Sequence, residues 1–574
     1  MAYDDMYEDL HTKEGQNKIY RLAKQREKNS RDINGAPKVI KNKDGKLIIK
    51  EKEIMNRWKE YFQELLNFNS HILHLDEHSP CQNLVQPITE QEIITCLKHM
   101  KNNKARGPDD IPESLKALGD DGIHLLTNLY NKILGNEEVP QKWRQSYLVP
   151  IFKNKGDPHN CQNYRGIKLM SHCLKLYEKI IEKRLRDIIE IGETQFGFMP
   201  GRSTTDAIHA IRQMSEKYRE KNKKLHMVFL DLEKAFDRIP RKLIWWALRH
   251  KKVPEKYIRI IEDMYMGHTT MVRSTTGTSA GFTIAEGVHQ GSALSPLLFI
   301  TVIDVLAQSI PQTVPWNMIF ADDIVILAES KDEMKERLVN WINILETHGL
   351  KVNREKTEYM VIGGDETESI DINDWQISAI ESCKYLGSTI QTNGTIEKEI
   401  KNKINQGWLK WRSLSGVLFD KRIPHKSKGK IYSSIVQPTI LYSSETWPTK
   451  ESDERSLQTM EMRMLRMIAG VTRKDKVRST RILKSLKVMP IKTKLMVNRL
   501  RWYGHTMRRP MNYIGNKVER LEVMGKRKRG RPKLQWGHKV RANIKKYKID
   551  KRDCTNNIKW REMLKELTTR KGES

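Results

Sequence analysis

Two adjacent carboxylates, Asp322 and Asp323, interrupt an apolar part of the chain. The runs on either side, 316–320 and 324–328, are short and apolar, which predicts two strands joined by a hairpin with the acidic pair at its tip. Aspartate is also common in solvated turns, because its side chain bonds to nearby backbone. The pair alone therefore fits an ordinary turn, and a chemical role requires another carboxylate close by.

Asp231 supplies that third carboxylate. It directly follows the apolar run 227–230, which predicts a strand with Asp231 at its carboxyl end, where open α/β folds place ligand-binding groups. Three gathered carboxylates repel one another unless cations neutralise them. Mg²⁺ is the natural cation because it prefers oxygen ligands, and two such ions about 3.5–4 Å apart support in-line phosphoryl transfer. The predicted chemistry is nucleotidyl transfer.

The composition indicates the kind of partner. The 574 residues include 103 Lys and Arg against 71 Asp and Glu, a formal charge of +32, which favours a polyanion, with nucleic acid ahead of an anionic membrane surface. The longest apolar stretch, 294–307, is too short to span a bilayer and contains Asp304. It predicts a buried helix, and no membrane is expected as a partner. Six scattered cysteines and the lack of a signal pattern predict an intracellular protein, in the nucleus, the cytoplasm or both.

The order of elements predicts mixed α and β structure followed by helices. Residues 1–100 form a basic, helical amino-terminal extension. From Pro140 onward strands and helices alternate, and after about residue 396 the pattern is mainly helical and basic. The expected strands are 146–152, 227–230, two around Met271 and Phe282, and 358–363; the expected helices are 174–189, one from about Glu233, one after Pro296, and 334–349.

Seven segments resemble the reverse transcriptases of non-LTR (LINE-type) retrotransposons, and the likeness is closest to the RTE-like group. It is strong from about Pro140 to Ile390 and weaker downstream, in ILYSSETWPTK, RWYGHTMRR and GKRKRGRPKLQW. Each motif is short, but all seven occur in the order of the family. They are NYRGIKL, QFGFMPGRSTTDAI, FLDLEKAFD, GVHQGSALSPLLF, FADD, GLKVNREKTEYMVI and YLGSTI.

The resemblance implies an α+β, right-hand polymerase fold. Residues 101–395 would form the fingers and a palm with an antiparallel sheet, residues 396–480 a helical thumb, and residues 481–574 a basic nucleic-acid-binding region. The implied activity is RNA-directed DNA polymerisation: a DNA 3′-hydroxyl, from a primer or a nicked target, is extended on an RNA template with deoxynucleoside triphosphates. The implied cofactor is a pair of Mg²⁺ ions, with Mn²⁺ as the alternative.

The resemblance also assigns catalytic roles. Asp231 and Asp322 would hold both metals, with Asp323 as the third acidic member. Lys356 would protonate the departing pyrophosphate, as general acid catalysis allows. Asp237 lies in the same motif as Asp231 and is expected to face solvent or to cap local structure.

Five residues are implied to bind the incoming nucleotide. Phe236 would lie beneath its sugar and exclude a 2′-hydroxyl, which selects deoxynucleotides; ordinary helix packing is the alternative. Gln290, followed by Gly291, would bond to the sugar and phosphates through its amide. Arg165 would contact the triphosphate with its planar fork, and Lys153 is a second cation for this role.

Other residues are implied to hold primer and template. Tyr385, Leu386 and Gly387 match the turn that positions the primer end, and Arg202 would contact template backbone. A helix cap at Ser203 or Thr204 is a compatible structural role. The carboxyl-terminal cations resemble an AT-hook for A·T-rich minor grooves, although a nuclear-localisation signal or a solvated tail has the same composition. They are Lys526, Arg527, Lys528, Arg529, Arg531 and Lys533.

The sequence departs from the family in two ways. No endonuclease is recognisable, so a separate nuclease is a possible partner, and Asp110 stands where the family has glycine. These departures leave a second hypothesis open, a catalytically silent or domesticated nucleic-acid-binding relic. An RNA-dependent RNA polymerase would share the metal chemistry but conflicts with Phe236, and an intron-encoded splicing cofactor would require intron RNA.

Overall fold

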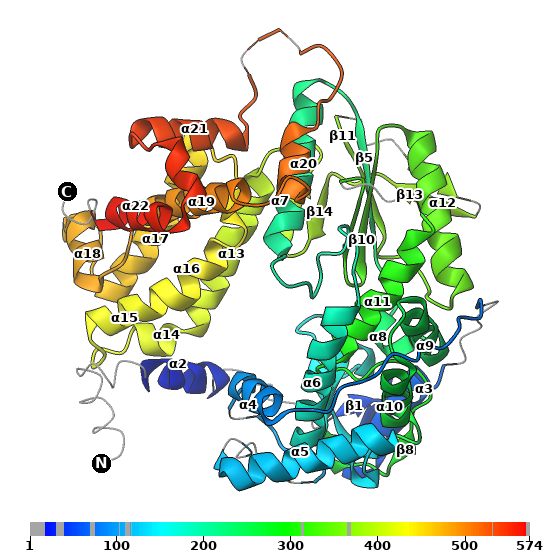
Figure 1. Cartoon of the computed structure of the whole chain (residues 1–574). Helices are drawn as coiled ribbons and strands as arrows, with labels where there is room; N and C mark the ends of the chain where they lie inside the picture. The colour runs from blue at the N-terminus through cyan, green and yellow to red at the C-terminus, as the bar shows by residue number, and fades with distance from the viewer. Residues whose placement is uncertain are drawn as a thin grey trace.

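The structure is a computed structural model of the chain (Figure 1). It describes residues 18–29, 39–68, 75–102, 104–109, 115, 117–310, 315–363, 369–372, 374–527, 529–530 and 532–569. Asp110, at the family departure noted above, lies outside the described residues.

A four-stranded antiparallel sheet forms the centre of the larger core. Its strand order is β11-β5-β10-β9. The two inner strands are β5 (Leu225–Leu230) and β10 (Asp323–Ala328), and the outer ones are β9 (Asn317–Phe320) and β11 (Glu358–Ile362). The predicted strand before Asp231 and the predicted hairpin around the acidic pair are therefore confirmed.

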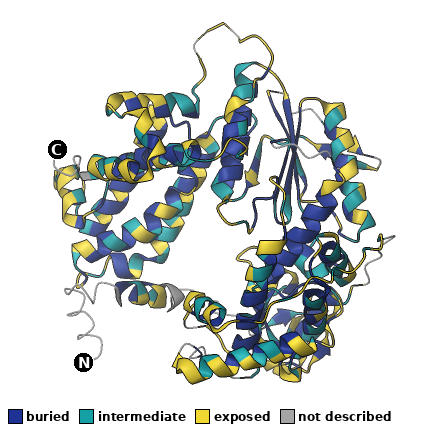
Figure 2. Cartoon of the chain, in the orientation of Figure 1, coloured by how far each residue is buried: buried dark blue, intermediate teal, exposed yellow. Residues whose placement is uncertain are grey.

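Both faces of this sheet are buried, which explains the uninterrupted apolar run of β5. Val228 and Leu230 belong to one hydrophobic core, whereas Met227 and Phe229 belong to another on the opposite face. Because successive side chains of a strand point to opposite faces, a strand covered on both sides needs apolar residues at consecutive positions. Figure 2 shows the strands of this sheet as buried along most of their length.

Helices cover the two faces. The hydrophobic core on one face is formed with α12 (Lys331–Thr347), which contacts β5 and β10, and with α6 (His172–Ile188), α9 (Arg241–His250), α10 (Glu255–Tyr265) and α11 (Ser295–Gln308). The opposite face packs against α7 (Thr204–Glu220), α20 (Ile514–Arg520) and a hairpin of β14 (Ser382–Tyr385) and β15 (Ser388–Gln391). The predicted buried helix is α11, and no helix in the described part of the chain combines the length and apolarity needed to cross a bilayer.

A second sheet lies beside the first, with strand order β4-β3-β6-β7 and β8 paired to β6. Helix α3 packs across it through Trp58 and Phe62, so part of the amino-terminal region belongs to this core. The elements are α3 (Glu51–Leu66), β3 (Gln145–Phe152), β4 (Tyr164–Leu169), β6 (Thr269–Ser274), β7 (Gly277–Thr278) and β8 (Phe282–Thr283).

Smaller elements surround the two sheets. Two further hairpins pair β1 with β2 and β12 with β13. The remaining elements before residue 396 are β1 (Ile40–Lys41), β2 (Leu47–Ile48), α4 (Glu90–His99), α5 (Gly119–Asn136), η3 (Gln141–Arg144), η4 (Cys161–Asn163), β12 (Ser369–Ile372) and β13 (Trp375–Ser378).

The chain after residue 396 is helical in its described part, as predicted. Helix α2 (Lys18–Asn29), from the other end of the chain, packs into the core of these helices through Ile19 and Leu22 (Figure 1). The elements are α13 (Glu397–Ser413), α14 (Ser415–Leu418), α15 (His425–Ile431), η5 (Tyr432–Val436), α16 (Gln437–Ile440), η6 (Ser444–Thr446), α17 (Glu451–Ala469), α18 (Ser479–Leu486), α19 (Ile491–Met507), α21 (Trp536–Lys546), η7 (Lys551–Thr555) and α22 (Asn557–Thr569).

The helix expected from about Glu233 begins at Ala235. It is α8 (Ala235–Arg238), a single turn. Lys234 has φ +49°, a left-handed conformation that a regular helix does not contain. Ile239 is extended because Pro240 follows it, and this ends the helix. The turn thus presents Phe236 and Asp237 beside the end of β5.

Candidate active site

Strand register brings the three predicted carboxylates together. In the antiparallel pair of β5 and β10, Leu230 lies opposite Ile324. One step further, the same register places Asp231 opposite Asp323, and Asp322 precedes Asp323 in the hairpin turn. All three side chains are half-buried. The hairpin turn is tight, with Ala321 at φ +58°.

Lys356 reaches the same place from a different segment. Its Nζ lies 3.1 Å from Oδ2 of Asp231. Backbone bonds hold this segment alongside the end of β5: the amide of Asn353 donates to the carbonyl of Asp231, and the amide of Glu233 donates to the carbonyl of Lys351. The predicted catalytic lysine therefore contacts a predicted catalytic aspartate.

The carboxylates lack sufficient positive charge. Burial, with the charges of Asp322 and Asp231, raises the pKa of Asp323 to about 7. Burial also raises the pKa of Asp322, against the opposing effect of Arg165 and Lys356. Divalent cations would relieve this, and carboxylate oxygens suit hard cations such as Mg²⁺. Among the described residues, no three His, Cys, Asp or Glu groups are arranged so that they could already hold a metal ion.

Replacing Asp323 by Asn is expected to stabilise the metal-free protein at pH 8 by about 2 kcal/mol, allowing for partial exposure. The folded-state pKa is above the ordinary value of 3.8, so ionisation of Asp323 opposes folding. This destabilisation develops as the pH rises from about 4 to about 7 and is complete above pH 7. Chemical unfolding in EDTA at pH 5 and pH 8 measures it. An advantage of the variant that is equal at both pH values would contradict the assignment.

Three cations lie near the carboxylates, and two of them, Lys153 and Lys356, line a cleft there. Arg165 projects from β4, where it pairs with Ile151 of β3, and Lys153 follows the end of β3. Burial lowers the pKa of Lys153, and the charges of Arg165 and Lys356 lower it further, so the three face a common space. The Lys153 ammonium donates to the carbonyl of Gln162 at 2.8 Å. The cleft has a volume of about 980 Å³, and its lining includes Lys153, Gln162, Lys234, Lys351, Arg354 and Lys356.

Phe236 is fixed by other aromatic rings. It stacks on Phe299 of α11 with ring centroids 4.3 Å apart, and it meets Phe198 in an edge-to-face arrangement with centroids 6.3 Å apart. The backbone amide of Val288 donates to the carbonyl of Phe236. Ring packing therefore holds this side chain in one orientation, and the packing alternative and the gate prediction are compatible.

Gln290 is held by Asp237, a residue expected to face solvent or to cap local structure. That expectation is wrong for the carboxylate, because Oδ1 of Asp237 accepts a 2.7 Å hydrogen bond from the Gln290 side-chain amide. Burial raises the pKa of Asp237 to about 6. The two partners are 53 positions apart in the sequence, which explains why no local pattern indicates the pair. Asp237 is thus a candidate positioning residue that the sequence did not identify.

The glycines of the same loop allow close backbone approach. Gly287 has φ +77°, and a Cβ there would collide with the carbonyl oxygen of Asp237. Gly291 has φ +114°, and its Cβ would lie 2.9 Å from the carbonyl oxygen of Lys168 in β4. The loop thereby joins α8 to the second sheet with Gln290 between them.

Removing the Asp237 carboxyl is expected to weaken nucleotide binding. In Asp237→Ala the Gln290 amide loses its partner, and we expect the KM for deoxynucleotide to rise about 10-fold with kcat changed much less. Asp237→Asn keeps a carbonyl acceptor and is the matched control, with a KM within about threefold of wild type. Single-nucleotide extension kinetics measure both values. An unchanged KM in Asp237→Ala would contradict the role of Asp237 as a positioning residue for Gln290.

Arg202 makes its contacts inside its own loop. Its guanidinium donates to the carbonyls of Gly192, at 2.9 Å, and Glu193, at 3.1 Å, and also to that of Gln195. In the described part of the chain these contacts do not reach the carboxylates, and the template role stays a prediction. Ser203 is the cap of α7, as the alternative proposed: its amide and hydroxyl both donate to Asp206.

The predicted primer residues form a hairpin turn against the central sheet. Leu386 and Gly387 connect β14 to β15, and Tyr385 ends β14 with its ring 5.4 Å from that of Phe229. Burial and the charge of Asp323 raise the pKa of Tyr385. The hairpin therefore lies close to the carboxylates.

The basic segment of the tail connects α20 to α21 (Figure 1). Arg527 lies 3.9 Å from Glu220 at the end of α7. Lys526, Arg527, Arg529 and Lys533 are exposed, whereas Lys528 and Arg531 lie outside the described residues. The nucleic-acid and localisation roles of this segment stay predictions.

Three carboxylates that converge beside a basic cleft are the arrangement expected of a nucleotidyl-transfer enzyme. Residues 152–390 match the family described as reverse transcriptase (RNA-dependent DNA polymerase), so the chain carries a reverse transcriptase domain. This stretch contains the carboxylates, Lys356, the cations at the cleft and the hairpin turn.

Two curated relatives come from Drosophila melanogaster. The chain is 26% identical over 410 residues to the probable RNA-directed DNA polymerase from transposon BS, an alignment that covers 67% of this chain and 45% of the relative. It is 23% identical over 408 residues to the RNA-directed DNA polymerase from mobile element jockey, with coverages of 67% and 44%. The chain thus spans a little under half the length of these relatives.

Among solved structures, telomerase from Candida tropicalis in complex with a TWJ fragment of telomeric RNA aligns with a TM-score of 0.36 and 13% identity, over 77% of this chain and 68% of that chain. The predicted relationship to reverse transcriptases of non-LTR retrotransposons is confirmed. The RTE-like subgroup, the lack of an endonuclease and the division into domains stay predictions.

Proposed function

We propose that this chain is an RNA-directed DNA polymerase of a non-LTR retroelement, which extends a DNA 3′-hydroxyl on an RNA template. The observation that carries the proposal is the convergence of Asp231, Asp322 and Asp323 beside a basic cleft, within a reverse transcriptase domain. The four-stranded antiparallel sheet would be the palm, the second sheet would belong to the fingers, and the helices after residue 396 would form the thumb.

Reverse transcriptases use divalent metal ions, and the donor set here suits Mg²⁺. Asp231 and Asp322 would hold two ions, and Asp323 would add negative charge next to them. When bound, such ions supply charge neutralisation for the attacking 3′-hydroxyl and the leaving pyrophosphate. The raised pKa of Asp323, about 7, supports this assignment because burial and the two neighbouring carboxylates disfavour its negative charge, which a bound cation would stabilise.

Arg165 and the cations of the cleft would bind the triphosphate. Arg165 would hold phosphate oxygens through its planar fork, and Lys153 would add a point charge. Lys356, now 3.1 Å from Asp231, carries the proton that it would give to pyrophosphate as this leaves. Lys356 would be free to turn from Asp231 to the phosphates once that carboxylate holds a metal ion.

Two residues would select and orient the deoxynucleotide. The Phe236 ring, fixed by stacking on Phe299, would exclude a 2′-hydroxyl. Gln290, oriented by its bond to Asp237, would present its amide to the sugar and phosphates. The exposed cations of the tail would bind template RNA or target DNA outside the catalytic site, in the nucleus or the cytoplasm.

Primer extension by the purified chain tests the proposal. A labelled DNA primer annealed to RNA is expected to be extended with deoxynucleotides in MgCl₂, to be inert in EDTA, and to recover when excess Mg²⁺ is returned. A chain that binds the primer–template without extending it at any Mg²⁺ or Mn²⁺ concentration would refute the proposed activity. That result would favour the relic hypothesis, in which the exposed cations bind nucleic acid without catalysis.

A further inference from the structure

The turn between β14 and β15 has an uncommon backbone that needs support. Leu386 and Gly387 form a two-residue connection, with φ +45° and +79°. Positive φ at both positions is typical of a type I′ hairpin turn, in which glycine and asparagine are usual and leucine is rare. In such a turn the carbonyl groups of the two central residues point away from the ladder, so they require other donors.

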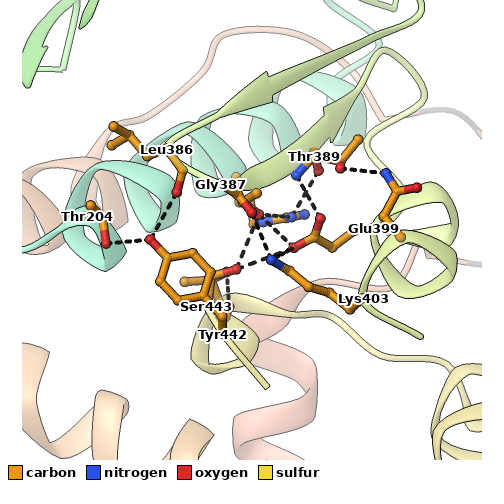
Figure 3. Close-up of polar contacts among 12 residues, drawn as sticks. Thr204, Leu386, Gly387, Thr389, Glu399, Lys403, Tyr442 and Ser443 are labelled. Carbon is orange, nitrogen blue, oxygen red and sulfur yellow. Dashed lines mark hydrogen bonds and ion pairs between the residues drawn. The ribbon is translucent and has the colours of Figure 1, made fainter. Parts of the chain in front are cut away.

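Two side chains from the helical region after residue 396, called the helical half below, supply those donors (Figure 3). The Tyr442 hydroxyl lies 2.9 Å from the carbonyl oxygen of Leu386, and the Lys403 ammonium lies 2.8 Å from that of Gly387. The Lys403 ammonium is also 4.7 Å from the centroid of the Tyr442 ring. Each central carbonyl of the turn thus has its own donor.

The direction of the hydrogen bonds follows from their chemistry. The carbonyl oxygen of Leu386 only accepts, so Tyr442 must donate its proton there. The hydroxyl of Thr204, 2.9 Å from that of Tyr442, must then donate to Tyr442. These two hydrogen bonds connect the start of α7, the bend after α16 and the 386–387 turn.

A buried polar network fixes the same hairpin from below (Figure 3). Glu399 of α13, 1% exposed, accepts from the hydroxyl of Ser388 at 3.0 Å and from the amide of Thr389 at 2.7 Å. Arg212 of α7 donates to the hydroxyl of Ser388 and to the carbonyl of Thr389. The hairpin is thus bonded on one side to α7, which packs on the central sheet, and on the other to α13, which belongs to the helices after residue 396.

We propose that Tyr442 and Lys403 are positioning residues that set the orientation of the 386–387 turn relative to the catalytic carboxylates. The inference rests on the proposed function, in which this turn aligns the primer end. Alignment of the primer end would then depend on the positions of α13 and of the bend at Tyr442, because each donates one hydrogen bond to a backbone carbonyl of the turn.

Tyr442→Phe removes the bond to the carbonyl of Leu386 together with the bond from the Thr204 hydroxyl. The ring and its contact with Lys403 remain, and Tyr442 is 38% exposed, so the lost hydroxyl leaves no buried cavity. Tyr432→Phe is the matched control: Tyr432 lies in the same helical half, and its hydroxyl donates to Glu461 rather than to the turn. Thermal unfolding of both variants shows whether either is generally destabilised.

Hydrogen exchange and single-turnover extension test the inference on the full chain. In Tyr442→Phe we expect the amides of residues 387–389 to exchange about 5- to 10-fold faster, and maximal extension rate to fall by a similar factor, while the Kd for primer–template stays within twofold. Tyr432→Phe should match wild type in all three. Lys403→Met, which removes the bond to the carbonyl of Gly387, should likewise speed amide exchange in the turn and lower the maximal extension rate.

The outcomes separate two kinds of failure. Unchanged exchange in Tyr442→Phe overturns the inference whatever the activity of the chain. Equal rate losses in Tyr442→Phe and Tyr432→Phe overturn it too, because the effect would then be general to the helical half. If the wild-type protein does not extend the primer, the proposed function is refuted. The wild-type sample of the same experiment gives this result independently of the variants.

Discussion

Asp322→Asn is expected to lower the rate of primer extension by about 1,000-fold or more. Asp322 lies in the turn between two strands that the ladder holds against Asp231, so its carboxylate has a fixed position. A ligand shared by two divalent cations contributes several kcal/mol of charge stabilisation, and about 4 kcal/mol corresponds to 1,000-fold in rate. Single-turnover extension of a DNA primer on RNA measures the loss.

The matched control for this variant is Asp371→Asn. Asp371 is an exposed aspartate of β12, and it accepts a 2.8 Å bond from Gln376 that an asparagine carbonyl can keep. It should extend primers at the wild-type rate. Both variants should bind primer–template equally well. More than a tenth of wild-type activity in Asp322→Asn would contradict the role of this carboxylate.

Phe236→Ala is expected to open the site to ribonucleotides. The Phe236 ring has little freedom, because it stacks on Phe299 at 4.3 Å and meets Phe198 edge-on. Under the proposed gate role, its removal clears the space that a 2′-hydroxyl would occupy. The preference for a deoxynucleotide over the matching ribonucleotide, as a ratio of kcat/KM, should fall about 100-fold, the size of discrimination that a steric contact supplies.

Phe236→Tyr keeps the ring and is the control for this variant. It should retain a preference for deoxynucleotides within about fivefold of wild type. Single-nucleotide incorporation with each substrate gives the ratios. If Phe236→Ala lost activity with both substrates in equal proportion, the ring would act only in packing, and the steric-gate assignment would be wrong.

The sequence predicted the parts of this site that depend on local patterns. An apolar run ending in Asp231 and two short runs around Asp322 and Asp323 indicated strands, because burial on both faces requires consecutive apolar residues. Adjacent strands then bring the carboxylates together through their register. The buried α11 and the helices after residue 396 were predictable for the same reason.

Contacts between distant segments were not predictable from the sequence. Nothing local to Asp237 indicates that its carboxyl accepts from Gln290, and nothing near Tyr442 indicates a bond to Leu386. The left-handed Lys234, which shortens α8 to one turn, depends on how the chain packs after β5. Long-range hydrogen bonds and unusual backbone angles follow from tertiary packing, which residue patterns do not encode position by position.

The most direct test of RNA-templated synthesis uses an RNA template of mixed, designed sequence. A DNA primer is extended with deoxynucleotides and Mg²⁺ by wild type and by a variant that combines Asp322→Asn with Asp323→Asn, and the products are sequenced. We predict DNA complementary to the template from wild type alone, with equal template binding by both proteins. Wild-type protein that binds the template and makes no complementary DNA, or a double variant that makes as much as wild type, would contradict the account.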